Sequence, residues 1–423
     1  MSTIIVFLDL EEGHSLPIFK LLRGLKERNH RVCCLGLSHI GDSVRRQGFE
    51  FIPIIDDVLP KENLNQEHLL ANYARNGLRD MYFESLVRGE VLDRIMAELK
   101  PDLGIFICHY YLEALAVHFR YKLPTVFFVP IFRAGSRQQA SEMIVEAVMD
   151  LKSGAVELLQ LLAESGVRVK SLNDVAQLVL QMPELMVLPQ ALDLPDRAAD
   201  SGMYYIGAGV DVERKEEPFD WTGISSAKPL VYCSLGSQNH MTSEISRRFL
   251  QLVIDSAATL PDKQFIVSIG KQFEATDFRN VPANVRLSQW VPQLEILRRA
   301  DLMINHAGFG AIKECVLMGT PMLAFPLRPE RDHDECAKRV VYHGLGLQGN
   351  VLDISADELT SMITRVLEDQ SFKQRVDLMR EKFIEQDRVD IGVQVIEDLI
   401  EVSPRPDMFH STNFFSGSAF LTS

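Results

Sequence analysis

A short apolar strand followed by a glycine-bearing turn has the chemistry of a phosphate site. Leu302–Asn305 is typical of a strand, and the run from His306 to Ala311 after it leads into a helix that carries Glu314. Gly308 and Gly310 let the backbone approach a phosphate, and a helix start favours negative charge. His306 can add a hydrogen bond or a positive charge, although a lone histidine at a strand end is more often structural. The segment predicts an anion site.

Upstream, Gln289-Trp290-Val291-Pro292-Gln293 places one of only two tryptophans beside a proline turn. Its flat ring could stack on a nucleotide base, and the neighbouring backbone could read the edge of a pyrimidine. Taken alone, however, this pattern favours an ordinary core tryptophan at the end of a strand.

Downstream, the polar loop 326–333 follows a further apolar strand and ends in Asp332 and His333. Open α/β sheets bind ligands at the carboxyl ends of their strands, which is where this loop is expected. A charged loop is usually only solvated, so the order and spacing of all three segments carry the prediction.

The amino-terminal half offers a candidate general base. Gly13 and His14 follow the first strand and precede a helix that has Pro17 in its first turn. Imidazole has the right pKa to accept a proton near neutrality, and a helix N-terminus disfavours its cationic form. The alternative is a surface histidine in a loop.

The candidate residues lie at the ends of predicted strands. Segments with strand-like and helix-like sequence patterns alternate along the whole chain. In the first half, strands are predicted at 3–8, 31–36, 49–55, 103–108 and 125–130, with helices at 16–27, 40–47, 112–119, 141–151 and 155–164. In the second half, strands are predicted at 229–234, 264–269, 285–288, 302–305 and 321–325, with helices at 243–258, 294–299 and 311–318. Such alternation indicates an α/β protein built from β-α-β units with parallel sheets.

The predicted organisation is two Rossmann-like, doubly wound domains that face a cleft. We assign residues 1–210 to an N-terminal domain with a helical insertion at 137–182, and residues 211–228 to a charged linker. Residues 229–402 form a C-terminal domain, and residues 403–423 form a loosely attached tail. A chain of 423 residues is long enough for two such domains.

The composition excludes several classes of partner. A net charge of −14 argues against nucleic acid, which needs clustered Lys and Arg. The six cysteines form no C-x-x-C pair and favour a reduced compartment, and the N-terminus lacks the basic region of a signal peptide. No window offers the ~18 apolar residues of a membrane span. We therefore expect a cytoplasmic protein, a monomer or a weak dimer.

In order and spacing, the second-half motifs resemble the donor signature of the UDP-dependent glycosyltransferases that include plant, macrolide and carotenoid enzymes. The matching residues are Trp290, Pro292, Gln293, His306, Gly308, Glu314, Gly319 and Pro321, with Asp332 after a two-residue insertion. Residues 229–237 also resemble the strand and turn of that family that end in Gly-Ser. The resemblance implies a GT-B fold, a UDP-sugar donor and a small-molecule acceptor, with no cofactor. It also implies that the N-terminal domain binds the acceptor, that the C-terminal domain binds the donor, and that the last helix returns to the first domain.

The same resemblance implies roles for individual residues. Trp290 would stack on uracil, the Val291 backbone would read its edge, and Glu314 would accept hydrogen bonds from the ribose hydroxyls. Asp332 and His333 would contact the hydroxyls of the sugar, and Gln293 is a further donor-binding residue of the signature. The diphosphate would be held by His306, Gly308, Gly310, Ala311 and Ser237.

On the acceptor side, Gly13-His14 resembles the family segment that carries the catalytic base. The family commonly pairs this histidine with an aspartate, but Cys108 occupies the matching position here. The orienting group is therefore absent, is supplied by His109, Glu12 or Glu113, or is unnecessary for an acidic acceptor such as a phenol. Cys108 as a nucleophile is the least favoured alternative, because it closes an apolar run.

Three departures from the family pattern affect the donor site. Gly310 and Ala311 stand where the family has Asn and Ser, and His333 replaces a Gln. Phosphate binding would then rest on backbone N–H groups, and galactose becomes as reasonable a sugar as glucose. The segment contains no Asp-x-Asp metal motif. We expect inverting, metal-independent transfer of a hexose from a UDP-sugar to a hydroxyl of a small apolar or aromatic acceptor.

Other functions fit less well. Gly344-x-Gly346-x-x-Gly349 matches a dinucleotide fingerprint, but it follows a predicted helix and therefore indicates a glycine helix terminus instead of a dehydrogenase. A nucleotide-sugar epimerase or hydrolase on the same fold, and a degenerate UDP-sugar-binding protein without turnover, remain as alternatives.

Overall fold

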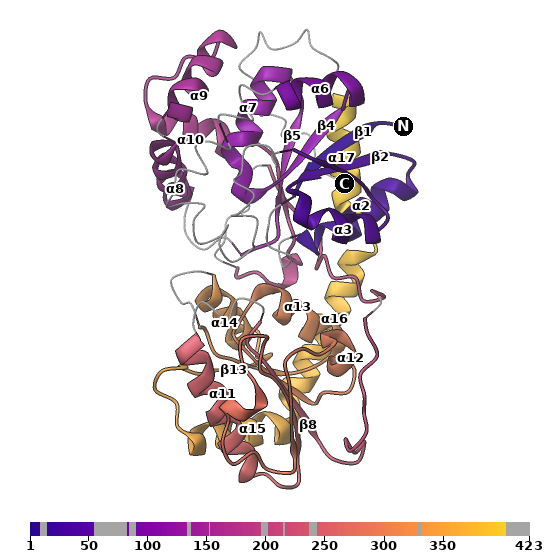
Figure 1. Ribbon diagram of the computed structural model, residues 1–423, viewed down its shortest axis with the longest axis vertical. Helices are drawn as coiled ribbons and strands as arrows, with labels where there is room; N and C mark the ends of the chain where they lie inside the picture. Colours follow the sequence, from indigo (N-terminus) through magenta and orange to yellow (C-terminus); the bar gives the residue numbers. More distant parts are fainter. Residues whose placement is uncertain are drawn as a thin grey trace.

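The computed structural model describes residues 1–8, 15–54, 83, 90–132, 137–151, 153–195, 202–214, 216–236, 243–327 and 332–402, without the side chains of residues 39, 90, 137–139 and 153. Two lobes, each built on one sheet, lie one above the other along the long axis of the molecule (Figure 1). The predicted pair of parallel-sheet α/β domains is confirmed.

The first lobe holds a seven-stranded sheet in the order β3-β2-β1-β4-β5-β6-β7, and every neighbouring pair is parallel. Its strands are β1 (Thr3–Phe7), β2 (Arg31–Gly36), β3 (Glu50–Pro53), β4 (Leu103–Ile107), β5 (Thr125–Val129), β6 (Glu184–Met186) and β7 (Met203–Tyr205). β4 and β5 are apolar and fully buried, as expected for strands covered on both faces. The strand order reverses between β1 and β4, so a crevice for ligands is expected at their carboxyl ends.

The helices of this lobe are α2 (Ile18–Glu27), α3 (Ser38–Arg46), α6 (Glu90–Leu99), α7 (Tyr111–Tyr121), α8 (Arg137–Asp150), α9 (Ser153–Glu164) and α10 (Leu172–Leu180). α10 was not predicted from the sequence, although Ser171 and Asp174 form a reciprocal capping box at its start. The three-residue strands β6 and β7 were also missed, because so short a strand shows no periodicity.

The second lobe holds a six-stranded parallel sheet in the order β10-β9-β8-β11-β12-β13. Its strands are β8 (Leu230–Ser234), β9 (Gln264–Ser268), β10 (Val285–Ser288), β11 (Leu302–Asn305), β12 (Met322–Ala324) and β13 (Gly346–Gln348). Its helices are α11 (Ser243–Ala258), α12 (Gln293–Leu297), α13 (Phe309–Met318), α14 (His333–Tyr342) and α15 (Ala356–Glu368). The order reverses between β8 and β11, which places the predicted anion turn at the switch point of this sheet.

The glycines at 344–349 end a helix, as predicted. α14 gives way to Gly344 in a left-handed conformation (φ 63°), and the chain then enters the unpredicted strand β13. No helix follows directly, so the arrangement needed for a dinucleotide fingerprint is absent from this described stretch.

The last two described helices, α16 (Gln370–Asp387) and α17 (Ile391–Val402), carry the chain back to the first lobe (Figure 1). α17 packs against α2, β4 and β7. A Cβ atom at Gly24 would lie 2.9 Å from Val393, and one at Gly392 would lie 2.9 Å from Leu21, so glycine permits this close packing. The predicted return of the C-terminal helix is confirmed.

Alternate residues of the second sheet enter two different cores. Val231 and Cys233 of β8 pack with α11 and α15, whereas Leu230 and Tyr232 join a core that continues into the first lobe. The period of two along a strand explains this division. One face of the second sheet therefore forms part of the core that connects the lobes.

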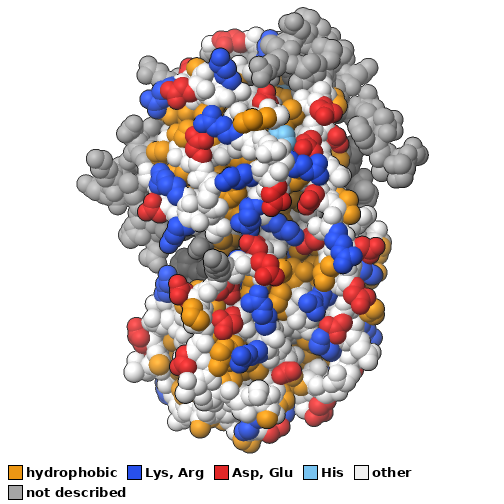
Figure 2. Space-filling model, turned by 90° about the vertical axis from the view of Figure 1, so that its right-hand side faces the viewer, with side chains coloured by type: hydrophobic (Ala, Val, Ile, Leu, Met, Phe, Trp, Pro, Cys, Tyr) orange, Lys and Arg blue, Asp and Glu red, His pale blue; other side chains and the backbone are white. Residues whose placement is uncertain are grey.

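The described surface carries both signs of charge. Figure 2 shows Lys and Arg interspersed with Asp and Glu over both lobes on the face in view. That pattern differs from the basic stripe of a nucleic-acid-binding protein. Among the described residues, no helix has the length and apolar character needed to cross a membrane.

Candidate functional site

The turn between β11 and α13 is held in an uncommon conformation. Ala307 is buried and left-handed (φ 61°), and its N–H donates to Asn305 Oδ1 at 2.8 Å. Such a conformation costs an alanine about 1–2 kcal/mol, and residues of this kind concentrate at functional sites. The turn aims the N-terminus of α13 out from the carboxyl end of the sheet, which suits an anion.

His306 lies between two glycine backbones. A Cβ at Gly236 would come within 2.5 Å of His306 Cε1, and a Cβ at Gly308 within 2.4 Å of His306 Nε2. Only glycine leaves room for the ring at these positions. Gly236 after β8 and Gly308 after β11 therefore both pack against one imidazole.

The His306 imidazole is neutral near pH 7. Burial, together with nearby His333, lowers its pKa to about 3, and the backbone of Ser234 opposes the shift. Nδ1 is buried without a hydrogen-bonding partner among the described residues. Of the two options left open by the sequence, the ring is thus a hydrogen-bonding group and not a fixed positive charge.

Asp332 and His333 reach the same place from α14. The rings of His306 and His333 lie edge to face with centroids 4.9 Å apart. Asp332 Oδ2 accepts a hydrogen bond of 3.3 Å from the backbone N–H of Phe132, which lies after β5 in the first lobe. The predicted sugar-binding pair thus lies where the lobes meet.

The outer side of the first turn of α13 is open. A Cβ at Gly310 would meet no described atom within 4 Å, and Ala311 is partly exposed. Residues larger than glycine fit this position, so Gly310 is not needed for space. Ser237, the further predicted phosphate contact, lies outside the described residues.

Trp290 is not a core residue. Its side chain is 54% exposed, whereas Val291 beside it is buried. The interpretation that the isolated pattern favoured is therefore wrong, and the ring is accessible for stacking. Pro292 and Gln293 begin α12 directly after it, which brings Gln293 beside α13.

Glu314 has a partner on each carboxylate oxygen. Oε1 accepts from Arg214 Nη1 at 2.7 Å, and Oε2 accepts from Gln293 Nε2 at 2.6 Å. Tyr232 Oη donates to Gln293 Oε1 at 3.1 Å, which orients the amide. Burial lowers the pKa of the Arg214 guanidinium, but its ion pairs with Glu314 and Glu216 outweigh burial and raise it.

The sequence did not identify Arg214, because it lies in a segment interpreted as a plain charged linker. That segment is attached to the second lobe. Glu216 Oε2 accepts from the N–H of Glu295, and Glu295 in turn accepts from Phe219 N and Trp221 Nε1. The signal available in the sequence was a charge pattern that alternates in sign, Asp-Val-Glu-Arg-Lys-Glu-Glu.

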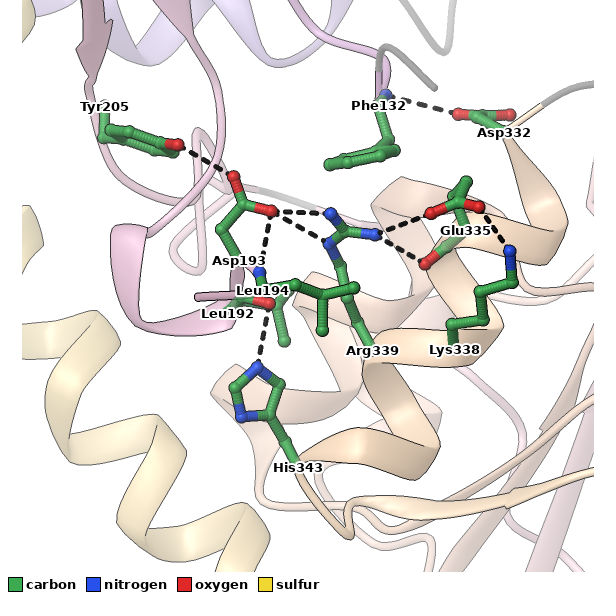
Figure 3. Close-up of polar contacts among 10 residues, drawn as sticks. All are labelled: Phe132, Leu192, Asp193, Leu194, Tyr205, Asp332, Glu335, Lys338, Arg339 and His343. Atoms are coloured by element: carbon green, nitrogen blue, oxygen red, sulfur yellow. Dashed lines mark hydrogen bonds and ion pairs between the residues drawn. The ribbon is translucent and has the colours of Figure 1, made fainter. Parts of the chain in front are cut away.

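A buried ion pair joins α14 to the first lobe (Figure 3). Arg339 Nη2 donates to Asp193 Oδ1 at 2.6 Å, and Asp193 Oδ2 also accepts from Tyr205 Oη at 2.8 Å. The guanidinium lies 3.5 Å from the centre of the Phe132 ring. The helix that begins with the predicted sugar-binding residues thus also fastens the lobes together.

Lys313, next to Glu314 on α13, makes a second buried contact between the lobes. Its Nζ donates to the carbonyl oxygen of Val187 at 2.8 Å and lies 4.2 Å from the centre of the Phe309 ring. Burial lowers the pKa of Lys313 to about 7. The sequence offered no sign of this role.

The acceptor side is less completely described. His14 and Glu12 lie outside the described residues. His109 is exposed in a 3₁₀ turn (Cys108–Tyr110) at the end of β4, and Glu113 is buried in the first turn of α7. Cys108 is buried, and none of the six cysteines, each of them described, is part of a disulfide. The predicted roles of His14, Glu12 and His109 stay predictions.

Comparison with known proteins finds glycosyltransferases. The family model for the Erythromycin biosynthesis protein CIII-like, C-terminal domain matches residues 251–401, which contain the β11–α13 turn, Trp290 and α14. The chain is 25% identical to NDP-glycosyltransferase YjiC of Bacillus subtilis (strain 168) over 405 residues, covering 93% of this chain and 96% of that protein.

A second relative and a solved structure agree. The chain is 25% identical over 408 residues to the oleandomycin glycosyltransferase of Streptomyces antibioticus, covering 94% of this chain and 90% of that protein. The crystal structure of the kitacinnamycin glycotransferase superposes with a TM-score of 0.74 at 22% identity, covering 94% of this chain and 99% of the other.

Proposed function

We propose that this chain, which belongs to the UDP-glycosyltransferase family of the GT-B type, transfers a hexose from a UDP-sugar to a hydroxyl of a small apolar or aromatic acceptor. The relatives along its whole length are glycosyltransferases, and the chain is a transferase of this kind. We propose four details of this reaction: the donor carries UDP, the sugar is a hexose, the anomeric configuration is inverted, and no metal ion is needed.

The observation that carries the proposal is the packing of His306. Two glycine backbones leave space for one partly buried imidazole just before a ten-residue helix, and its buried Nδ1 atom lacks a partner among the described residues. A buried polar atom without a partner costs about 1–3 kcal/mol. A diphosphate at the N-terminus of α13 would gain from the helix dipole and from a neutral hydrogen-bonding ring.

The nucleoside would lie between Trp290 and Glu314. The exposed indole offers a face for the base, and the buried carboxylate offers acceptors for ribose hydroxyls. Trp290 precedes the short helix α12, and Gln293 at the start of that helix donates a hydrogen bond to Glu314. Asp332 and His333 at the start of α14 would contact the sugar hydroxyls.

The proposed reaction is a single displacement. His14 accepts the proton of the acceptor hydroxyl while the acceptor oxygen forms a bond to the anomeric carbon. The bond from that carbon to the β-phosphate oxygen breaks, and its electron pair leaves with UDP. The start of α13 stabilises the charge that develops on the departing diphosphate. No covalent sugar–enzyme intermediate forms.

The test begins with binding of UDP and UDP-sugars by calorimetry, and continues with UDP release in the presence of phenols, carotenoids and macrolides. A transferase releases UDP only with an acceptor and makes a product of inverted anomeric configuration by NMR. Release without an acceptor would favour a hydrolase, conversion of the donor sugar an epimerase, and binding without turnover a degenerate module.

Two further measurements test the mechanism. His14→Ala should lower kcat by about 10²–10⁴-fold, the usual contribution of a general base. Activity should be unchanged by EDTA. Equal activity of wild type and His14→Ala with a good acceptor, or retention of configuration, would overturn the single-displacement scheme.

A further inference from the structure

The carboxylate of Glu314 is already satisfied by the protein. Glu314 is only 7% exposed. Its Oε1 accepts a hydrogen bond of 2.7 Å from Arg214, and its Oε2 accepts one of 2.6 Å from Gln293. A carboxylate has about four acceptor positions, so these two bonds leave about two for a ligand. Ribose hydroxyls can add to this arrangement without being needed to complete it.

Both partners are themselves held in place. Arg214 Nε and Nη2 also contact Glu216 Oε1 at 2.9 and 2.8 Å, and Gln293 accepts from buried Tyr232. The guanidinium therefore comes from the linker in a fixed orientation, and it neutralises charge beside a site that would bind a diphosphate. The carboxylate keeps its position whether or not a hydroxyl reaches it.

This arrangement bears on how the site distinguishes ribose from 2′-deoxyribose. A site that requires a substrate hydroxyl can reject the analogue without it by about 10⁴-fold or more, because its buried polar groups are left unpaired. When Glu314 meets a deoxyribose, Arg214 and Gln293 still pair with both of its oxygens. The penalty that would produce discrimination is missing.

We propose that Arg214 is a specificity-determining residue that makes the nucleotide site tolerant of 2′-deoxyribose. The chain then accepts diphosphates of both ribonucleosides and 2′-deoxyribonucleosides as donors. The proposal rests on the nucleotide-sugar function proposed above. Arg214 acts through Glu314, so it is a positioning residue and not a catalytic one.

The first measurement compares UDP with 2′-deoxyuridine diphosphate on the wild-type protein by isothermal titration calorimetry. These probes differ by one hydroxyl, so base, phosphate and charge are constant. We expect the two dissociation constants to agree within about tenfold, the effect of one ordinary hydrogen bond. This result requires no variant and cannot be confused with misfolding.

The second measurement repeats both titrations, with UDP and with 2′-deoxyuridine diphosphate, on Arg214→Met. This substitution removes the guanidinium and keeps an unbranched apolar side chain. Glu314 Oε1 then loses its partner, so the 2′-hydroxyl becomes important and the ratio of dissociation constants should rise by about tenfold or more. Arg214→Lys restores the charge and should recover part of the wild-type ratio.

Arg298→Met is the matched control. Arg298 Nη2 donates to the carbonyl oxygen of Val212 at 2.6 Å, so it holds the same linker, and it makes no hydrogen bond or ion pair with Glu314 in the described part of the chain. This variant should keep the wild-type ratio. A ratio that rises equally in Arg298→Met and Arg214→Met would show a merely structural effect and overturn the role of Arg214.

The outcomes separate this proposal from the one on which it rests. If the wild type binds neither diphosphate, the nucleotide-sugar function fails and the specificity proposal fails with it. If it binds UDP but rejects the deoxy analogue by more than about a hundredfold, the function stands and the specificity proposal is wrong. A ratio unchanged in folded Arg214→Met also overturns it.

Discussion

The proposed donor side on the second lobe and the helical insertion on the first lobe are built on different principles. On the second lobe, the β11–α13 turn and α14 present buried polar groups with defined partners, such as Glu314 with Arg214 and Arg339 with Asp193. On the first lobe, α8 and α9 expose apolar side chains, including Met143, Met149 and Val156. Hydrogen bonds have strict geometry, whereas apolar contacts tolerate changes of shape. We infer that the donor side is specified residue by residue and the acceptor side by its general character.

The largest effect should come from breaking the ion pair that fastens α14 to the first lobe. Arg339→Met leaves Asp193 buried without its cation and should reduce stability by about 3–5 kcal/mol. Lys338→Met breaks an exposed pair with Glu335 on the same helix and should cost less than about 0.5 kcal/mol. Chemical denaturation of the two variants measures the difference. Similar losses would mean that burial does not distinguish these pairs.

The next effect concerns the two glycines of the anion turn. Gly308→Ala places a Cβ against His306 and should weaken UDP binding by about 10- to 100-fold, the usual contribution of a hydrogen bond to a charged group. Gly310→Ala meets no described atom and should leave UDP binding unchanged. Because alanine favours helix by up to ~1 kcal/mol, the second variant should also melt slightly higher. Calorimetry and thermal melting measure both, and equal losses in affinity would contradict the assigned packing.

Lys313, on α13 of the second lobe, should make the stability of the protein depend on pH. Burial lowers its pKa to about 7, below the ordinary 10.5, so between these values the unfolded chain binds more protons than the folded one. Stability should therefore rise with pH above 7, by at most about 1.4 kcal/mol per unit from this residue. The increase is complete once the pH passes the unfolded pKa.

A comparison of the wild type with Lys313→Met isolates the part of the change of stability with pH that comes from Lys313. Both proteins contain the same buried cysteines, so their contributions cancel in the difference. We expect urea midpoints between pH 7 and 9.5 to rise more steeply for the wild type. Parallel curves would show that Lys313 is not buried in its neutral form.

The smallest effects should fall on the first lobe. Met143→Ser and Met149→Ser alter exposed side chains of α8 and should change stability by less than about 0.5 kcal/mol. The dissociation constant for UDP should stay within about twofold of the wild-type value, which is roughly the scatter expected for residues that do not interact with the site. Only the KM for an apolar acceptor is expected to change. A large loss of UDP affinity would contradict the separation of the two sides.

Local patterns in the sequence predicted much of the donor side. The strand at 302–305, the helix that ends at Met318 and the helix terminus at Gly344 depend on neighbours in sequence, and each lies where it was expected. The return of α17 to the first lobe was also foreseen. The three-residue strands β6, β7 and β13 were not, because their pairing is decided by the sheet they join.

Sequence alone determined the alternation of strands and helices, the glycine-bearing turn after the strand at 302–305, and the family signature, because each depends on residues close together in the chain. It could not decide that Trp290 would be exposed. Nor could it pair Arg214 with Glu314, Lys313 with Val187, or Arg339 with Asp193, contacts that join residues 100, 126 and 146 positions apart. Such contacts form only when the folded chain brings distant polar groups into a shared, water-poor interior, where an unpaired charge would be too costly to keep.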